Sequence, residues 1–285
     1  MDTAETSLGI NGNKLYQKRA RLALPILVRQ AKADTIISYQ DLAEEINMPN
    51  ARNLNYPLGS IGTSLKELSE KWGEAIPQIQ CIVVNQHTGL PGEGIGWFIS
   101  DINEFKKLNR KQQKVLVDAE LANIFAYPKW DLVLKTLGLK PAPISESIIK
   151  KVRTAATTKA RGGEGPQHRK LKNFIKSHPA CVGINLKNIV SETEKDLPSG
   201  DSIDVSFENK NVWIGVEVKS EISNETDILR GLYQCVKYQA VMESYLFVSN
   251  SQKDVEVILA LGCGLPRELI SVRNSLGIKV IENVK

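Results

Sequence analysis

The chain has 285 residues, of which 37 are Lys or Arg and 32 are Asp or Glu, for a net charge of +5. This length exceeds the usual size of a single hydrophobic core, so we expect two domains. The N-terminus lacks an apolar signal core and no apolar run approaches transmembrane length, which argues against a membrane partner. Four cysteines without C-x-x-C spacing are typical of a reducing cytoplasm.

The first half of the chain is expected to form a small, mostly helical domain. Residues 14–32 have a helical pattern despite Pro25, and Ser38 is placed to cap a second helix in an S-x-x-D box. A helix, a strand, a Gly/Pro-rich loop and another helix are then expected at residues 58–71, 79–84, 89–94 and 103–126. Helices followed by a strand and a wing-like loop indicate a winged-helix-like α+β domain.

The stretches ISYQDLAEEI, GSIGTSL and IPQIQCIVVN resemble the winged-helix part of alkylguanine-DNA alkyltransferases. That family places a reactive cysteine in a Pro-Cys-His-Arg motif, whereas this chain has Gln80-Cys81-Ile82-Val83. We therefore expect Cys81 to be a core cysteine and do not expect alkyl transfer. The resemblance implies that the helix at 58–71 enters a DNA groove. Its candidate DNA contacts are Ser60, Thr63 and Lys66. A domain that contacts protein instead is the alternative.

A basic block follows the first domain. The Lys140-Pro141-Ala142-Pro143 stretch marks a boundary, which gives domains at 1–139 and 164–285 and a basic linker at 140–163. Residues 150–176 carry nine basic side chains against Glu164, so this segment has a charge of +8 and the rest of the chain has −3. Such a block suits contact with a phosphate backbone, and a solvated linker is the alternative. The expected nucleic-acid contacts are Lys150, Lys151, Arg153, Arg161, His168, Arg169, Lys172 and Lys176.

Two strands in the second half carry a pair of carboxylates and a lysine. Residues 202–208 and 212–219 both alternate between apolar and polar positions, and the first strand is expected to place three apolar residues on one face: Ile203, Val205 and Phe207. A two-residue turn at Lys210-Asn211 would set Asp204 directly opposite Glu217, with Lys219 on the same face. Opposed Cβ atoms lie about 4.5–5.5 Å apart, where two like charges repel each other. The pattern therefore favours a bound Mg²⁺ (or Mn²⁺) that offsets the repulsion.

The elements around these strands indicate a mixed α/β sheet with helices on both faces. A helix over 227–243 carries Gln234 and Tyr238, which share one face because they lie four residues apart. Another helix is expected near 166–177, and a further one at either 255–263 or 266–276. Short strands are expected at 245–248 and 278–281.

The stretches SGDSIDV, VEVKS and QCVKY resemble the core of the PD-(D/E)xK nuclease superfamily, in its subgroup with a Q-x-x-x-Y helix. The resemblance covers roughly residues 164–285 and implies a restriction-endonuclease-like fold. It implies that Asp204 and Glu217 ligate the metal with Glu164 as a third acid, and that Lys219, Gln234 and Tyr238 complete the catalytic set. Asp201 is the alternative to Asp204, and Glu192 and Glu194 are weaker alternatives to Glu164. Ile203 stands where the family name has proline.

The expected function is a magnesium-dependent endonuclease that hydrolyses DNA, of the restriction or phage-defence type, with the first domain reading DNA. The alternative is a non-catalytic nucleic-acid-binding or regulatory protein that uses the nuclease fold as a scaffold. RNA stays open as a substrate. Cleavage of both strands with one site per chain would require a homodimer, which also stays open.

Overall fold

The computed structural model describes residues 7–99, 102–142 and 165–285. The chain forms two compact units, residues 1–143 and 144–285, and the division falls within the segment expected to be a linker. Helices combined with a five-stranded mixed sheet agree with the α/β class expected from the sequence.

Unit 1 is built from helices around a two-stranded sheet. In chain order its elements are α2 (Leu15–Lys32), β1 (Ile37–Ser38), α3 (Tyr39–Glu45), η1 (Ala51–Leu54), α4 (Asn55–Trp72), η2 (Ile79–Ile82), β2 (Val83–Val84), η3 (Glu93–Ile95), α5 (Gly96–Ile99), α6 (Ile102–Lys107), α7 (Arg110–Ala126) and α8 (Trp130–Thr136). The η elements are 3₁₀ helices. One hydrophobic core joins α2 and α4 to α7 and α8, with Leu24, Leu65, Ile124 and Trp130 among its buried members.

The first helices of unit 1 form where the sequence predicts them, whereas the strand predicted at 79–84 is mostly absent. Ser38 caps α3, because its Oγ accepts a hydrogen bond from the Asp41 amide at 3.0 Å. The strand expected at 79–84 is mostly 3₁₀ helix, and only Val83–Val84 pair, in parallel with β1. The helix expected at 103–126 is two helices, because Asn109 caps α7. The described part of unit 1 therefore lacks the antiparallel hairpin of a wing.

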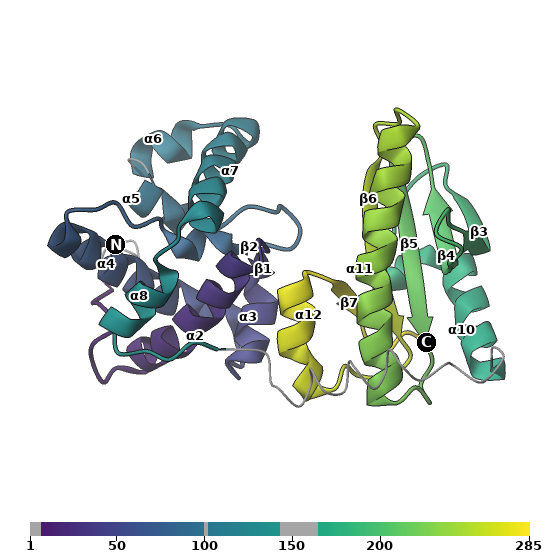
Figure 1. Cartoon of the computed structure of the whole chain (residues 1–285), viewed down its shortest axis with the longest axis horizontal. Coiled ribbons are helices and arrows are strands. Elements are labelled where there is room, and N and C mark those ends of the chain that lie inside the picture. The colour runs from purple at the N-terminus through teal and green to yellow at the C-terminus, as the bar shows by residue number, and fades with distance from the viewer. Residues whose placement is uncertain (1–6, 100–101, 143–164) are drawn as a thin grey trace. The chain divides into compact units, whose positions relative to one another are not determined.

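Unit 2 is a five-stranded mixed sheet with helices on both faces (Figure 1). Its elements are α10 (Pro166–Ser177), η4 (Pro179–Val182), β3 (Val190–Asp196), β4 (Ser202–Glu208), β5 (Val212–Lys219), α11 (Glu225–Val248), β6 (Asp254–Leu261), η5 (Arg267–Leu269), α12 (Ile270–Leu276) and β7 (Lys279–Ile281). The strands lie in chain order. The β3–β4 and β4–β5 pairs are antiparallel, and the β5–β6 and β6–β7 pairs are parallel.

Two hydrophobic cores lie on opposite faces of this sheet. Trp213 and Leu259 pack with α11 and α12, whereas Val216 and Ile258 pack with Ile175 of α10. Both faces of β5 are therefore buried, as is usual where a strand has helices on each side. Any charged side chain on β5 must then lie in a buried or half-buried environment.

Three elements of unit 2 differ from the expectation. Residues 245–248 continue α11, and Phe247 and Val248 are more than 80% exposed, so the buried strand expected there is wrong. Of the two alternatives for a late helix, 266–276 contains η5 and α12, while 255–263 is mostly strand β6. Strand β3 was not expected, because its sequence VSETEKD is polar and it forms an exposed edge of the sheet.

Candidate active site

Strands β4 and β5 separate at Asp204. They pair from Val205 with Val216 to Glu208 with Trp213, which confirms the register set by the Lys210-Asn211 turn. The ladder stops before Asp204, so the direct Asp204–Glu217 pair is not formed. Ile203 packs in the core beside α11, whereas Val205 packs beside α10. The expectation of one apolar face is thus wrong for Ile203, because the strand changes its facing at Asp204.

Side chains replace the missing ladder bonds at this point. The Val218 amide donates to Asp204 Oδ2 at 2.8 Å, and the Val218 carbonyl lies 2.9 Å from His168 Nε2. The same His168 nitrogen lies 3.3 Å from Asp204 Oδ2. Asp204 and His168 therefore complete the hydrogen bonding of β5 and meet each other in the gap between the strands. A backbone that needs both partners holds the two side chains in place.

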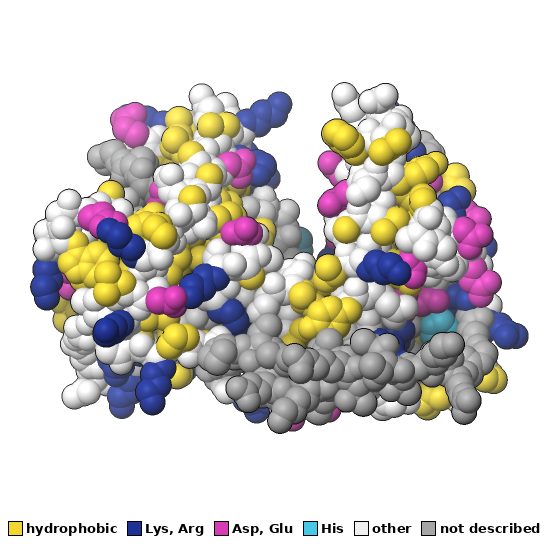
Figure 2. Space-filling view, viewed as in Figure 1, with side chains coloured by type: hydrophobic (Ala, Val, Ile, Leu, Met, Phe, Trp, Pro, Cys, Tyr) yellow, Lys and Arg dark blue, Asp and Glu magenta, His cyan; other side chains and the backbone are white. Residues whose placement is uncertain are grey.

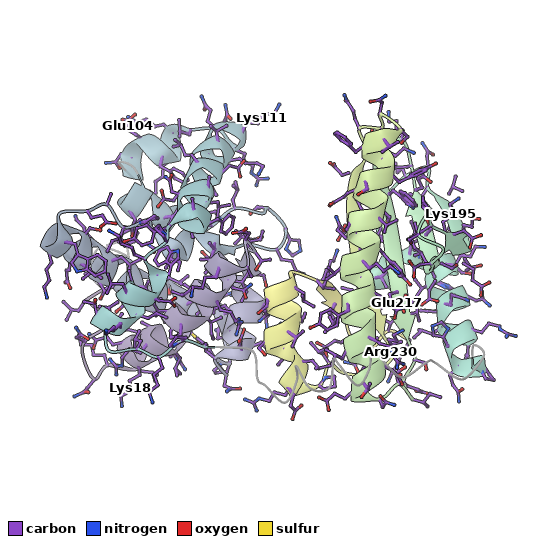
Figure 3. All side chains as sticks on the ribbon, in the orientation of Figure 1. Lys18, Glu104, Lys111, Lys195, Glu217 and Arg230 are labelled. Carbon is purple, nitrogen blue, oxygen red and sulfur yellow. The ribbon has the colours of Figure 1, made fainter. Side chains whose placement is uncertain are left out.

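Glu217 and Lys219 form a second, connected pair on β5. Glu217, labelled in Figure 3, is 3% exposed, and its Oε1 accepts from Lys219 Nζ at 2.5 Å. Lys219 Nζ also donates to Gln234 Oε1 at 3.2 Å, and Gln234 Nε2 lies 3.2 Å from the hydroxyl of Tyr238. The Tyr238 hydroxyl donates to the Ser202 carbonyl at 3.3 Å. These bonds link β5, α11 and the start of β4, and they join four of the five residues expected to be catalytic.

A glycine lets α11 lie directly over Lys219. A Cβ atom added at Gly231 would lie 2.8 Å from Leu259 Cδ1 and 3.0 Å from Lys219 Cε, closer than ordinary packing allows. A larger residue would require the Leu259 and Lys219 side chains to shift. Gly231 therefore leaves room for the Lys219 side chain in the conformation that reaches Gln234, three residues later.

The electrostatics of the site centre on Glu217. Burial, followed by the negative charge of Asp204, raises the pKa of Glu217 to about 7, although Lys219 opposes the shift. Burial lowers the pKa of Lys219, but the charge and hydrogen bond of Glu217 outweigh it and the net pKa is raised. The site thus holds a cationic lysine beside a carboxyl group that burial and the charge of Asp204 both shift toward its neutral form. A further cation near Asp204 and Glu217 would favour full ionisation.

The carboxylates fit a hard divalent metal with few protein ligands. Within residues 7–99, 102–142 and 165–285, no group of three or more His, Cys, Asp or Glu side chains is arranged to hold a metal. Mg²⁺ commonly binds through one or two carboxylates, several waters and substrate phosphate oxygens. Asp204 Oδ1 and Glu217 Oε2 form no hydrogen bond with the described residues, so each has an oxygen to offer. Glu164, the expected third acid, lies outside the described residues.

The basic block is only partly described, and one of its members is buried. Lys172 is 3% exposed and donates to Glu194 Oε1 at 2.7 Å, so the expectation that it contacts DNA is wrong. It lies on the face of α10 that packs on the sheet. Arg169 is exposed and Lys176 is half-buried. On the face that Figure 2 shows, the basic side chains of unit 2 are interspersed with acidic ones. Four expected contacts lie outside the described residues: Lys150, Lys151, Arg153 and Arg161.

The alternative acids are engaged elsewhere. Asp201 binds Lys237 Nζ at 2.7 Å and the Ser199 hydroxyl at 2.5 Å. Glu192 binds Lys195 at 2.9 Å, and Glu194 binds Lys172. These pairings leave Asp204 as the acid that meets His168.

In unit 1, two of the expected DNA contacts are used inside the fold. Ser60 is fully buried and donates to the Leu8 carbonyl at 2.7 Å, so the expectation that it reads DNA is wrong. Thr63 donates to the Ser7 carbonyl at 3.0 Å. The N-terminal segment therefore covers this face of α4. Lys66 is exposed and lines a cavity of about 740 Å³ together with Glu120. That cavity lacks the paired carboxylates found in unit 2.

The sequence did not predict that His168 contacts Asp204, although helix phase could have indicated it. His168, Lys172 and Ile175 are spaced by four and three residues and so share one face of α10. Lys172 and Ile175 are buried against the sheet. Once that face is known to be the inner one, His168 must point toward the strands as well.

No helix in the described parts of the chain has the length and apolar character needed to cross a bilayer. Comparison with protein-family models, curated proteins and solved structures gave no match. Functional inference therefore depends on the residues and geometry of the site.

Proposed function

We propose that this protein is a metal-dependent nuclease that hydrolyses phosphodiester bonds in DNA. The observation that carries the proposal is the convergence of Asp204, Glu217 and Lys219 at the end of β5, with Glu217 buried and its pKa raised to about 7. Strongly perturbed carboxylates beside a fixed lysine are typical of catalytic sites. The PD-(D/E)xK resemblance, with its Gln234 and Tyr238 helix, gives the same reading. A restriction or phage-defence setting, with unit 1 reading DNA, belongs to the proposal too.

The chemistry divides among the residues as follows. Hydrolysis adds water across one P–O bond, and negative charge grows on the phosphate oxygens as the bond breaks. The Lys219 ammonium can stabilise that charge. Hydrogen bonds to Gln234 and Glu217 hold the ammonium in one orientation. Asp204 and Glu217 would hold Mg²⁺, which when bound lowers the pKa of water and neutralises phosphate charge. Gln234 acts as a positioning residue through Lys219.

One observation favours the rival function, a non-catalytic nucleic-acid-binding protein on this scaffold. Both carboxylates already have partners inside the protein, because Asp204 accepts from Val218 and lies beside His168, and Glu217 binds Lys219. A scaffold that never binds metal would be stabilised in this way. The two functions differ in whether a metal binds through Asp204 and Glu217.

A nicking assay tests the proposal. Supercoiled plasmid is incubated with the full chain in Mg²⁺, Mn²⁺ or EDTA, and plain, methylated and single-stranded DNA and RNA are compared. We expect metal-dependent cleavage that falls by about 10²-fold or more in Asp204→Ala and Lys219→Ala. Lys237→Ala, an exposed lysine on α11, is the control and should cut normally. Unchanged cleavage in both site variants would overturn the assignment. Calorimetry that finds no Mg²⁺ or Mn²⁺ binding through Asp204 and Glu217 would support the rival.

A further inference from the structure

A pocket of about 290 Å³ opens in unit 2 next to the candidate active site. Its walls come from three parts of the fold: α10, the segment after β5, and the segment after β6 together with the end of the chain. The lining includes Gln167, Leu171, Phe174, Ser220, Gly262 and Val284.

The pocket and the active site share two segments of chain. Ser220 follows Lys219, and Gln167 precedes His168, whose ring reaches the Val218 carbonyl. The Gly262 amide donates to the Lys219 carbonyl at 2.8 Å, so the β5 and β6 walls are hydrogen-bonded to each other. Strands β5 and β6 are parallel, and the pocket lies just beyond their carboxyl ends. Ligands of open α/β sheets bind outside this edge.

The floor of the pocket is apolar and its shape depends on a glycine. Leu171 and Phe174 pack against the core beside α10, and Val284 is 6% exposed within that core. A Cβ atom at Gly262 would lie 2.8 Å from the Glu221 amide and 3.3 Å from Leu171 Cδ2. A larger residue would therefore collide with the wall. The glycine keeps open a short apolar recess between α10 and the ends of the strands.

The rim of the pocket carries charge. Lys170, Lys285 and Glu221 line it and are exposed. An apolar floor beside the Lys170 ammonium suits a flat ring attached to a phosphate. The volume of about 290 Å³ lies just below the ~300–1,000 Å³ range of small-molecule sites. It therefore suits a single ring system better than a complete nucleotide.

We propose that this pocket holds one nucleobase of the strand whose phosphodiester lies at Glu217 and Lys219. The base enters the recess between Leu171, Phe174 and Val284, and its backbone passes Lys170. Seating the base fixes the strand, so the adjacent phosphate is held at the lysine. The inference rests on the proposed function for the position of that phosphate, but base binding itself needs no cleavage.

The test measures binding in EDTA, where metal-dependent cutting is absent. The probe is a short fluorescein-labelled single-stranded oligodeoxynucleotide, compared with a set in which one abasic residue is moved along the strand. Gln167→Trp places an indole at the pocket mouth without changing charge. Asn173→Trp is the matched control, because Asn173 is an exposed amide residue of the same helix that does not line the pocket. Fluorescence anisotropy gives the affinity of each protein variant for each oligonucleotide.

For the unaltered chain we expect one abasic position to weaken binding by about five- to hundredfold, the range of one lost base contact. Gln167→Trp should weaken binding of the intact strand similarly and remove the effect of that abasic position. Asn173→Trp should behave like the unaltered chain. Equal binding at every abasic position, or equal behaviour of the two Trp variants, would overturn the pocket. If the protein shows this binding pattern but cuts no DNA, the base-binding pocket is supported and the proposed nuclease function is overturned.

Discussion

The two units differ in how fully their buried polar and charged groups are paired. In unit 1, Arg29 and Glu45 form a two-fold hydrogen-bonded ion pair at 2.7 and 2.8 Å, and Ser60 bonds to the Leu8 carbonyl. In unit 2, Glu217 is buried beside a second carboxylate, and its pKa is raised to about 7. Burying charge that is only partly compensated destabilises a protein, so stability alone does not account for such a site. The buried polar groups of unit 1 thus hold the fold, whereas those around Glu217 are better explained by chemistry.

A Glu→Gln substitution can be made in each unit, and the one at Glu217 is expected to have the largest effect, on cleavage. Glu217→Gln removes a carboxylate that would hold the metal, so we expect Mg²⁺ binding to be lost and cleavage to fall by about 10²–10⁴-fold. Thermal stability should change little, because the lower cost of burying a neutral amide offsets the loss of the ion pair with Lys219. Calorimetry, nicking assays and thermal melts measure the three quantities.

Glu45→Gln should have the opposite effect. It breaks a partly buried ion pair with Arg29 and should lower the free energy of unfolding by about 3 kcal/mol. Cleavage per folded molecule should be preserved, as seen when activity is normalised to the folded fraction. If Glu217→Gln proved the more destabilising of the two, the distinction between the units would fail.

The stability of unit 2 should also depend on pH through Glu217. The pKa of Glu217 rises from an ordinary 4.5 to about 7 on folding, so the folded state binds the proton more tightly. Its contribution to stability is therefore complete below about pH 4.5 and is lost as pH rises through about 7. The loss is on the order of 3 kcal/mol, and added Mg²⁺ should recover part of it above pH 7. The raised pKa of Lys219 acts only at much higher pH.

Urea melts from pH 5 to 8 would measure this contribution. The groups whose charge acts on Glu217 are Asp204, Lys219 and His168, and all three remain in Glu217→Gln. The difference between the unaltered chain and this variant therefore isolates Glu217. Parallel stability curves for the two proteins would show that Glu217 does not titrate in this range.

Two basic residues on α10 should have separable effects. Lys172→Ala removes a buried side chain whose partner, Glu194, is exposed and regains water, so we expect a loss of about 1 kcal/mol in unfolding free energy, mostly from lost packing. Arg169→Ala changes an exposed residue, and should instead weaken DNA binding and reduce the salt slope by about 1. Denaturant melts and salt-dependent anisotropy distinguish them. A DNA-binding defect in correctly folded Lys172→Ala would return Lys172 to the DNA surface.

The smallest effect is expected in unit 1. Ser60→Ala removes the hydrogen bond to the Leu8 carbonyl and should cost about 1 kcal/mol of stability. DNA affinity should not change, because Ser60 is fully buried. Lys66→Ala is the exposed comparison on the same helix and should leave stability almost unaltered. A weaker DNA complex with Ser60→Ala at normal stability would contradict this assignment.

Local sequence patterns predicted several features of unit 2. Alternation and a two-residue turn predicted the β4–β5 register, and four-residue spacing placed Gln234 next to Tyr238. Such features depend on residues close together in the sequence, so they can be predicted without knowledge of the fold. Strand β3 could not be predicted, because an exposed edge strand has little apolar pattern.

The sequence is enough to identify the groups that could carry chemistry: two carboxylates and a lysine on adjacent strands, with a Gln/Tyr helix after them. How these groups meet depends on contacts that form only in the folded chain. Asp204 leaves the ladder to bond the Val218 amide, His168 arrives from α10, and Lys172 and Ser60 turn inward. These outcomes depend on which face of each helix packs inward and where a strand ends its pairing. Contacts between segments far apart in the chain fix both, so a local pattern such as the helix phase of α10 predicts a contact only once the inner face of the helix is known.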